Sequence, residues 1–91
     1  MAADLEPARA AALAAARSFR LGMDAQGNEA FVAFVDAVQP ALAASPTLAA
    51  AVSPLLGPLL AAQERADTLR MADLLEFEIR PRLEEKSSAG G

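Results

Sequence analysis

The sequence contains no cysteine, histidine, tryptophan or tyrosine, and these absences exclude several classes of function. Without cysteine there is no disulfide, thiolate nucleophile or cysteine-ligated zinc. Without histidine, the commonest acid–base group and the Glu-x-x-His ligands of di-iron helical bundles are also missing. Ser45 and Ser53 fit better as helix caps than as nucleophiles, and Ser18 has no base near it in the sequence. We therefore expect no enzyme activity, no metal site and no cofactor.

Aromatic residues and positive charge are both scarce. The aromatic residues are four phenylalanines, and the net charge is −4. A nucleic-acid-binding surface needs basic groups and usually aromatic stacking platforms, so we expect no nucleic-acid partner. The N-terminal segment "MAADLEPARA" is acidic and lacks an apolar run, which predicts no secretory signal and a cytoplasmic protein.

One long segment, between Asp36 and Glu64, carries no charge. It is long enough to cross a bilayer. However, it contains four prolines, is dominated by alanine, and has no basic flank of the kind that sets membrane topology. We expect buried helices of a soluble protein here rather than a membrane span.

The apolar content is high but consists largely of small side chains. Apolar residues make up 54% of the 91 residues, yet 24 are alanine and only 25 are leucine, valine, isoleucine, methionine or phenylalanine. The length allows one domain, predicted over residues 1–86 with a flexible tail at 87–91. Because a core this small is marginal on its own, we expect completion by dimerisation, most simply as a two-fold homodimer.

Strand-forming residues are few, whereas alanine and leucine favour helix. A first helix is predicted from a cap at Asp4 to a stop near Gly22. Spacings of three and four place one apolar face of this helix toward the core, formed by Leu5, Ala8, Ala12, Ala15 and Phe19. The charged residues of an adjacent arc are expected to be exposed, namely Glu6, Arg9, Arg17 and Arg20.

The segment "DAQGNE", residues 24–29, is predicted to be a loop. Its glycine and glutamate do not fall at the positions of a calcium-binding EF-hand loop. We expect Asn28 to cap a second helix that ends or bends at Pro40. The densest group of bulky residues lies on one side of that helix, comprising Phe31, Phe34, Val35, Val38 and Leu42.

Two serine–proline pairs follow, at Ser45 and Ser53. Each resembles a helix start, with a serine cap and proline in the first turn, which predicts a short helical turn and then a helix from Pro54. The expected buried side carries Val52, Leu56, Leu59 and Leu60. This helix, over 54–66, should form an antiparallel hairpin with the last one.

The last helix is predicted over 68–85, capped by Asp67. The helical period explains more residues than strand alternation, which fits only Phe77 to Arg80. One face of this helix should be buried, with Leu69, Ala72, Leu75, Ile79 and Leu83, and Met71 at its margin. Two ion pairs at four-residue spacing are expected, Glu76–Arg80 and Glu78–Arg82.

A second apolar stripe is expected on the opposite side of the last helix, formed by Leu74, Phe77 and Pro81. Such a stripe is buried in the bundle, buried across a self-dimer, or offered to a different protein. We assign partner binding to these three residues and to Arg70 beside them. Phe31 and Phe34 of the second helix are the other candidates for contact with a partner.

The sequence therefore predicts an all-α protein: a small antiparallel bundle of about four helices with a C-terminal helical hairpin. The leading hypothesis is a non-catalytic protein–protein interaction module that associates with itself through apolar helix faces. In size and helicity the chain also resembles small bacterial export chaperones and flagellar accessory proteins. That resemblance implies an alternative function, in which the protein masks an amphipathic segment of a client protein. We assign this masking role to the helix that carries Phe31 and Phe34.

Overall fold

The protein is an all-α globule of four helices, as the sequence predicts. The computed structural model describes the backbone of residues 4–89 and the side chains of residues 4–84, and it contains no strand in that part of the chain. The fourth helix runs without a break through three segments, the middle one a wider π-helical turn. The elements are α1 (Glu6–Arg20), α2 (Asp24–Ala44), α3 (Pro46–Glu64), α4 (Thr68–Asp73), the π-helical segment η1 (Leu74–Ile79) and α5 (Arg80–Ala89).

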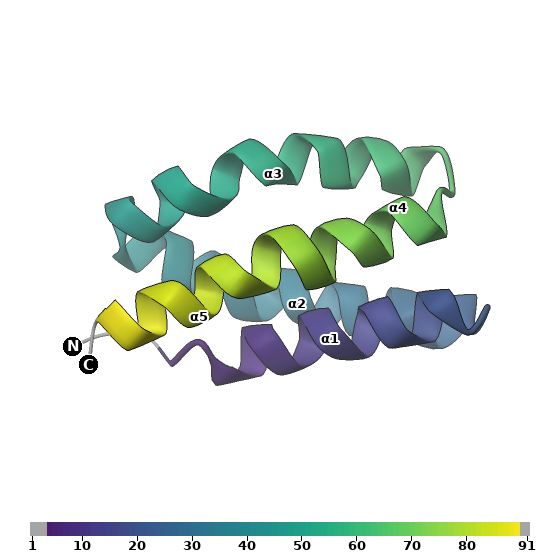
Figure 1. Ribbon diagram of the computed structural model, residues 1–91, viewed down its shortest axis with the longest axis horizontal. Helices are drawn as coiled ribbons and strands as arrows, with labels where there is room; N and C mark the ends of the chain where they lie inside the picture. Colours follow the sequence, from purple (N-terminus) through teal and green to yellow (C-terminus); the bar gives the residue numbers. More distant parts are fainter. Residues whose placement is uncertain (1–3, 90–91) are drawn as a thin grey trace.

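The helices run alternately up and down along a molecule of 37 × 20 × 19 Å. In Figure 1, the helix formed by α4, η1 and α5 lies between α3 and α1, and α2 lies behind. Contacts join α1 with α2, α2 with α3, and both α1 and α3 with the last helix. The C-terminal hairpin predicted from the short connection is thus confirmed.

The core lies along the axis between the helices, with small side chains on the side of α1 and bulky side chains on the side of the other helices. Every core position of α1 except its ends is alanine, with Leu5 and Phe19 closing the row. Small side chains let α2 approach α1 closely, so the bulky part of the core comes from the other helices. Its largest fully buried members are Phe19, Phe34, Leu59, Met71, Leu75, Ile79, Leu83 and Val52.

The two ends of α1 follow the sequence signals. The carboxylate of Asp4 accepts a hydrogen bond of 3.0 Å from the backbone N–H of Glu6. Gly22 adopts a left-handed φ of 76°, and the N–H of Met23 donates to the carbonyl of Ser18 over 2.8 Å. This pattern closes a helix at glycine because glycine has no Cβ to clash in that conformation.

The predicted loop at 24–29 is wrong, because α2 already begins at Asp24 and Asn28 lies inside it. Tertiary packing explains the difference. Gly27 is buried against Phe19, and a Cβ at this position would lie 2.6 Å from the phenylalanine ring. Gly27 therefore serves as a contact point between α1 and α2, and its packing overrides its weak helix propensity.

The prolines do not interrupt the helices in the way the sequence analysis expects. Pro40 lies inside α2, and Pro54 and Pro58 lie inside α3, so residues 46–64 form one helix and Ser53 is no cap. Each of these prolines is exposed. The carbonyls that lose their helical donor, four residues earlier, belong to Asp36, Ala50 and Pro54, which are exposed as well. Water can satisfy them, which lowers the cost of keeping the helix continuous.

The two remaining caps are confirmed. Ser45 is the only residue between α2 and α3, and its hydroxyl accepts a hydrogen bond of 3.1 Å from the N–H of Leu48. The carboxylate of Asp67 accepts one of 3.1 Å from the N–H of Arg70. Between α3 and α4 the chain turns through Ala66, a non-glycine residue with a positive φ of 56°.

Replacing Ala66 with glycine is expected to stabilise the protein. A left-handed conformation costs an L-residue about 1–2 kcal/mol, while glycine loses about 0.5–1 kcal/mol more backbone entropy on folding. The net gain for Ala66→Gly should be about 0.5–1 kcal/mol, measured as a higher urea midpoint at unchanged slope. A lower midpoint would show that this turn is not left-handed in solution.

The π-helical segment changes which residues of the last helix face the core. The N–H of Arg80 donates to the carbonyl of Leu75, five residues back, so this turn holds about one residue more than an α turn. In a regular α-helix, residues spaced four apart rotate gradually around the helix axis. The wider turn offsets this rotation and keeps one row of residues buried, and the members of that row are each at most 1% exposed: Met71, Leu75, Ile79 and Leu83.

One prediction for the faces of the last helix is wrong: Leu69, expected in the core, is 60% exposed at the start of α4. Leu74 of the second stripe is 2% exposed and belongs to the core, as in the alternative that buries this stripe inside the bundle. Phe77 of the same stripe is 60% exposed, so the structure separates two residues that a constant period of 3.6 residues puts on one face. Leu74 begins the segment where the period changes.

The predicted ion pairs are replaced by others. Glu76 pairs with Arg20 of α1, Arg80 pairs with Glu84, and Arg82 donates a hydrogen bond of 2.7 Å to the carbonyl of Ala51 in α3. The contacts of Glu76 and Arg82 tie the last helix to both neighbours, whereas the Arg80–Glu84 pair lies within it. The last helix continues to Ala89 rather than to about residue 85, and of the predicted tail at 87–91, residues 90–91 lie outside the described residues.

Candidate functional site

An apolar groove runs between α2 and α3, and we refer to it as the α2–α3 groove. It encloses a volume of about 130 Å³. Its walls combine the bulky face of α2 with the leucines of α3, and its polar member is a single glutamine. The lining residues are Phe31, Phe34, Val35, Val38, Gln39, Leu42, Leu56, Leu59 and Leu60.

The floor of the groove is buried and its rim is accessible. The rings of Phe31 and Phe34 stack with centroids 6.4 Å apart and an interplanar angle of 25°. Both rings are buried, whereas Leu60 at the rim is 50% exposed. An engineered apolar cavity of about 150 Å³ is known to accept a benzene ring, so the groove can receive one or two apolar side chains.

Helix α3 is poorly covered by its own chain. Of its most apolar 18-residue window, 22% is buried, and no charged residue precedes Glu64 at its end. By length and composition alone, this helix could cross a membrane. Core helices of soluble proteins often meet the same two criteria. The outer side of α3 carries no charge before Glu64 and adjoins the α2–α3 groove at Leu60.

The structure places the two predicted groups of partner-binding residues on different sides of the molecule. Phe31 and Phe34 form the floor of the α2–α3 groove. On the last helix, Phe77 is 60% exposed, and Pro81 and Arg70 are exposed too, but Leu74 lies in the core. The second stripe is therefore reduced to a phenylalanine and a proline, and a role of these residues in partner binding stays a prediction.

A charge cluster beside Phe77 has a structural explanation. The guanidinium of Arg20 donates to Asp73 over 3.0 Å and to Glu76 over 3.1 Å, and it lies 5.0 Å from the centre of the Phe77 ring. The hydrogen bond to Asp73, followed by that to Glu76, raises the pKa of Arg20 against the opposing effect of desolvation. This cluster fixes the end of α1 to the last helix.

The sequence predicts the bulky residues that form the floor of the groove, but it does not predict that a groove is open above them. It expected Leu56 and Leu60 in the core, whereas Leu56 is half-buried and Leu60 is half exposed. The signal for an open face was present in the uncharged run between Asp36 and Glu64, which contains half of the α2 wall and all of the α3 wall.

Comparisons of the chain with protein-family models, with curated proteins and with solved structures gave no match. Among the residues that the structure describes, no group of three or more acidic side chains is placed to hold a metal ion.

Proposed function

We propose that this chain is a protein–protein interaction module without catalytic function, and that its α2–α3 groove binds a second copy of the chain in a two-fold dimer. The observation that supports this best is the pairing of an open apolar groove with a half-exposed leucine on its rim. In a two-fold interface the same patch occurs on both partners, so a protrusion and a recess must lie side by side. Leu60 and the α2–α3 groove meet that requirement.

Charge favours the same face. Each copy carries a net charge of −4, so two copies repel each other at most of their surface. Between Asp36 and Glu64 there is no charged residue, and this run supplies the second half of α2 and nearly all of α3. The α2–α3 face is therefore where two copies approach with the least repulsion and the lowest desolvation cost.

The surface area of the α2–α3 face is sufficient for a stable dimer interface. A stable interface buries about 800 Å² on each partner, which is roughly a sixth of the 5125 Å² that this chain exposes. Two of the four helices border the α2–α3 face, so such an area fits without using the charged surface of α1 and the last helix. Burying it also compensates for a core in which alanine fills most positions of α1.

The test is sedimentation of the wild type and of Leu60→Asp over a range of concentrations. We expect the wild type to reach twice the 9.4 kDa of one chain, and Leu60→Asp to weaken dimerisation at least about 100-fold, because a carboxylate would be buried in an apolar interface. Helicity of the variant should stay near that of the wild type, since Leu60 is 50% exposed in the single chain. Its melting temperature should match that of the wild type at concentrations where both are monomeric and fall below it where the wild type is a dimer.

Leu69→Asp is the matched control, because Leu69 is 60% exposed and lies outside the groove. It should leave dimerisation unchanged. Phe77→Asp distinguishes the two candidate surfaces: if it dissociates the dimer while Leu60→Asp does not, the contact lies on the last helix and the groove proposal is wrong. Co-sedimentation of the wild type with phosphatidylcholine vesicles would contradict the proposal as well, since α3 would then be covered by lipid.

A second candidate function is masking of an amphipathic helix of another protein, as export chaperones do. The observation that favours it is the stacked Phe31–Phe34 floor of a single apolar pocket, which can receive one or two apolar side chains from one face of a helix. This function predicts a monomer at all concentrations that binds a synthetic amphipathic helix in the α2–α3 groove, with affinity lost in Leu60→Asp. A wild-type dimer that excludes such a peptide would reject it.

A further inference from the structure

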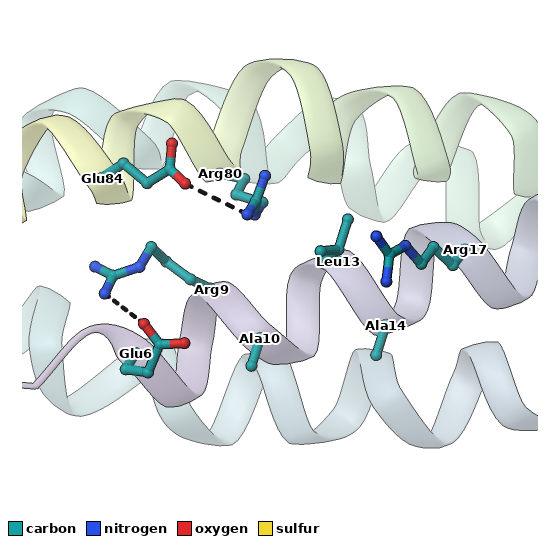
Figure 2. A pocket seen from close by; sticks show the side chains of 8 residues that line it. All are labelled: Glu6, Arg9, Ala10, Leu13, Ala14, Arg17, Arg80 and Glu84. Carbon is teal, nitrogen blue, oxygen red and sulfur yellow. Dashed lines mark hydrogen bonds and ion pairs between the residues drawn. The ribbon is translucent and has the colours of Figure 1, made fainter.

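A second groove, polar rather than apolar and open to solvent, lies between α1 and α5 and has a volume of about 770 Å³. Figure 2 shows the side chains that line it. Three of the chain's arginines take part: Arg9 and Arg17 from α1 and Arg80 from the start of α5. We call it the arginine groove. Ala10 and Ala14 lie between the charged side chains of α1, and their small size keeps the space between the helices open.

The lining of the arginine groove is positive in an acidic protein. Two carboxylates share the lining with the three guanidinium groups: Glu6 accepts from Arg9 over 2.6 Å, and Glu84 pairs with Arg80 over 3.4 Å. One positive charge is left over, whereas the whole chain has a net charge of −4. Anions are thus attracted to this groove and repelled by most of the remaining surface.

Two guanidinium nitrogens at this groove are buried and have no hydrogen-bond partner in the structure: Nη1 of Arg9 and Nε of Arg80. A buried donor without an acceptor costs about 1–3 kcal/mol, more when it is charged. Such groups are rare in folded proteins, and an ordered water or a bound ion is one of their common explanations. The two nitrogens have almost no accessible surface, so an acceptor between α1 and α5 reaches them only after the side chains of Arg9 and Arg80 turn into the groove that both residues line.

We propose that the arginine groove binds a small phosphorylated molecule, with its phosphate between Arg9 and Arg80. Phosphate carries three acceptor oxygens and about −1.5 to −2 charges, which suits guanidinium groups from two walls better than a single carboxylate does. The volume of the groove lies within the range of about 300–1,000 Å³ typical of small-molecule sites and exceeds what one ion fills. Leu13, with Ala10 and Ala14, supplies an apolar wall for the body of the ligand.

The site is separate from the α2–α3 groove, since the two share no lining residue. Its failure and the failure of the proposed dimer are therefore distinguishable. The sequence analysis treated Arg9 and Arg17 as an exposed edge of α1, and their meeting with Arg80 requires the pairing of the first helix with the last.

The test is titration with phenyl phosphate and with inorganic phosphate, followed through the arginine Nε–Hε signals and through the melting temperature. We expect both probes to shift the signals of Arg9 and Arg80 and to raise the melting temperature, phenyl phosphate at lower concentration. Sodium chloride at equal ionic strength should do neither. Absence of binding by both probes at 10 mM, or an equal effect of chloride, would overturn the proposal.

Three variants define the role of the residues. Arg80→Ala should weaken phenyl phosphate binding at least about 10-fold, because it removes a charge-assisted donor. Arg65→Ala, which removes an exposed arginine outside the groove, should leave binding unchanged. Glu84→Gln should tighten binding several-fold, because it removes the carboxylate that competes for Arg80. Equal losses in Arg80→Ala and Arg65→Ala, or weaker binding in Glu84→Gln, would contradict a phosphate site at this place.

Discussion

Leu74→Asp is expected to unfold a large part of the protein, whereas Phe77→Asp leaves it folded. The two residues are three positions apart in the π-helical segment, yet Leu74 is 2% exposed and Phe77 is 60% exposed. Truncating a buried leucine costs about 2–5 kcal/mol, and a buried carboxylate without a partner adds to that loss. The total for Leu74→Asp should exceed about 4 kcal/mol, against a stability of about 5–10 kcal/mol for a domain of this size.

The cost of Phe77→Asp is limited by its exposure. Its ring contributes a cation–π contact with Arg20 at 5.0 Å, worth about 0.5–1 kcal/mol at an exposed site. A carboxylate there meets Arg20 but also the neighbouring Asp73 and Glu76, so gain and loss nearly cancel. Circular dichroism and urea unfolding of both variants provide the measurement. Equal destabilisation would show that the last helix is a regular α-helix with the faces expected from sequence periodicity.

Gly27→Ala is expected to destabilise the protein by about 2 kcal/mol, although alanine is the better helix former. The new Cβ would lie 2.6 Å from Cδ1 and Cε1 of the Phe19 ring, which is 2% exposed and cannot move aside. Since α1 and α2 meet here, the overlap must push the helices apart or force the ring from its rotamer. The melting temperature should fall by about 10 °C.

Gly57→Ala is the matched control, a second glycine inside a helix. A Cβ at this position meets nothing within 4 Å. The gain in helix propensity, about 0.5–1 kcal/mol, is reduced because the residue before Pro58 is crowded by the proline ring. We expect a change between zero and that gain, measured by thermal unfolding beside Gly27→Ala. A neutral or stabilising Gly27→Ala would contradict the close packing of α1 on α2.

The helical class, the hairpin and most of the core could be predicted from the sequence because they depend on local signals. Asp67 and Ser45 act through hydrogen bonds to residues three positions away, and the row from Ala8 to Phe19 follows from spacing alone. The start of α2 could not be predicted, since it depends on a contact between Gly27 and Phe19 in another helix. The continuity of α3 could not be predicted either, since it depends on which prolines face solvent.

In the candidate sites, too, the local features could be predicted from the sequence and the features that depend on tertiary contacts could not. Phe31 and Phe34 were identified as a bulky face, but whether a face is covered or forms the floor of a groove depends on the path of α3. The different exposure of Leu74 and Phe77, two members of one predicted stripe, could not be predicted, because the wider turn of the π-helical segment has no recognised sequence signal here. The arginine groove was missed because Arg9 and Arg80 are brought together only by the antiparallel arrangement of the first and last helices.

The most direct test of the dimer model is a dilution series followed by methyl NMR. The account predicts concentration-dependent shifts for the methyl groups of Val35, Leu42, Leu56 and Leu60 and none for Leu69. A chain that stays at 9.4 kDa with unchanged spectra at every concentration, or shifts confined to residues around Phe77, would contradict it.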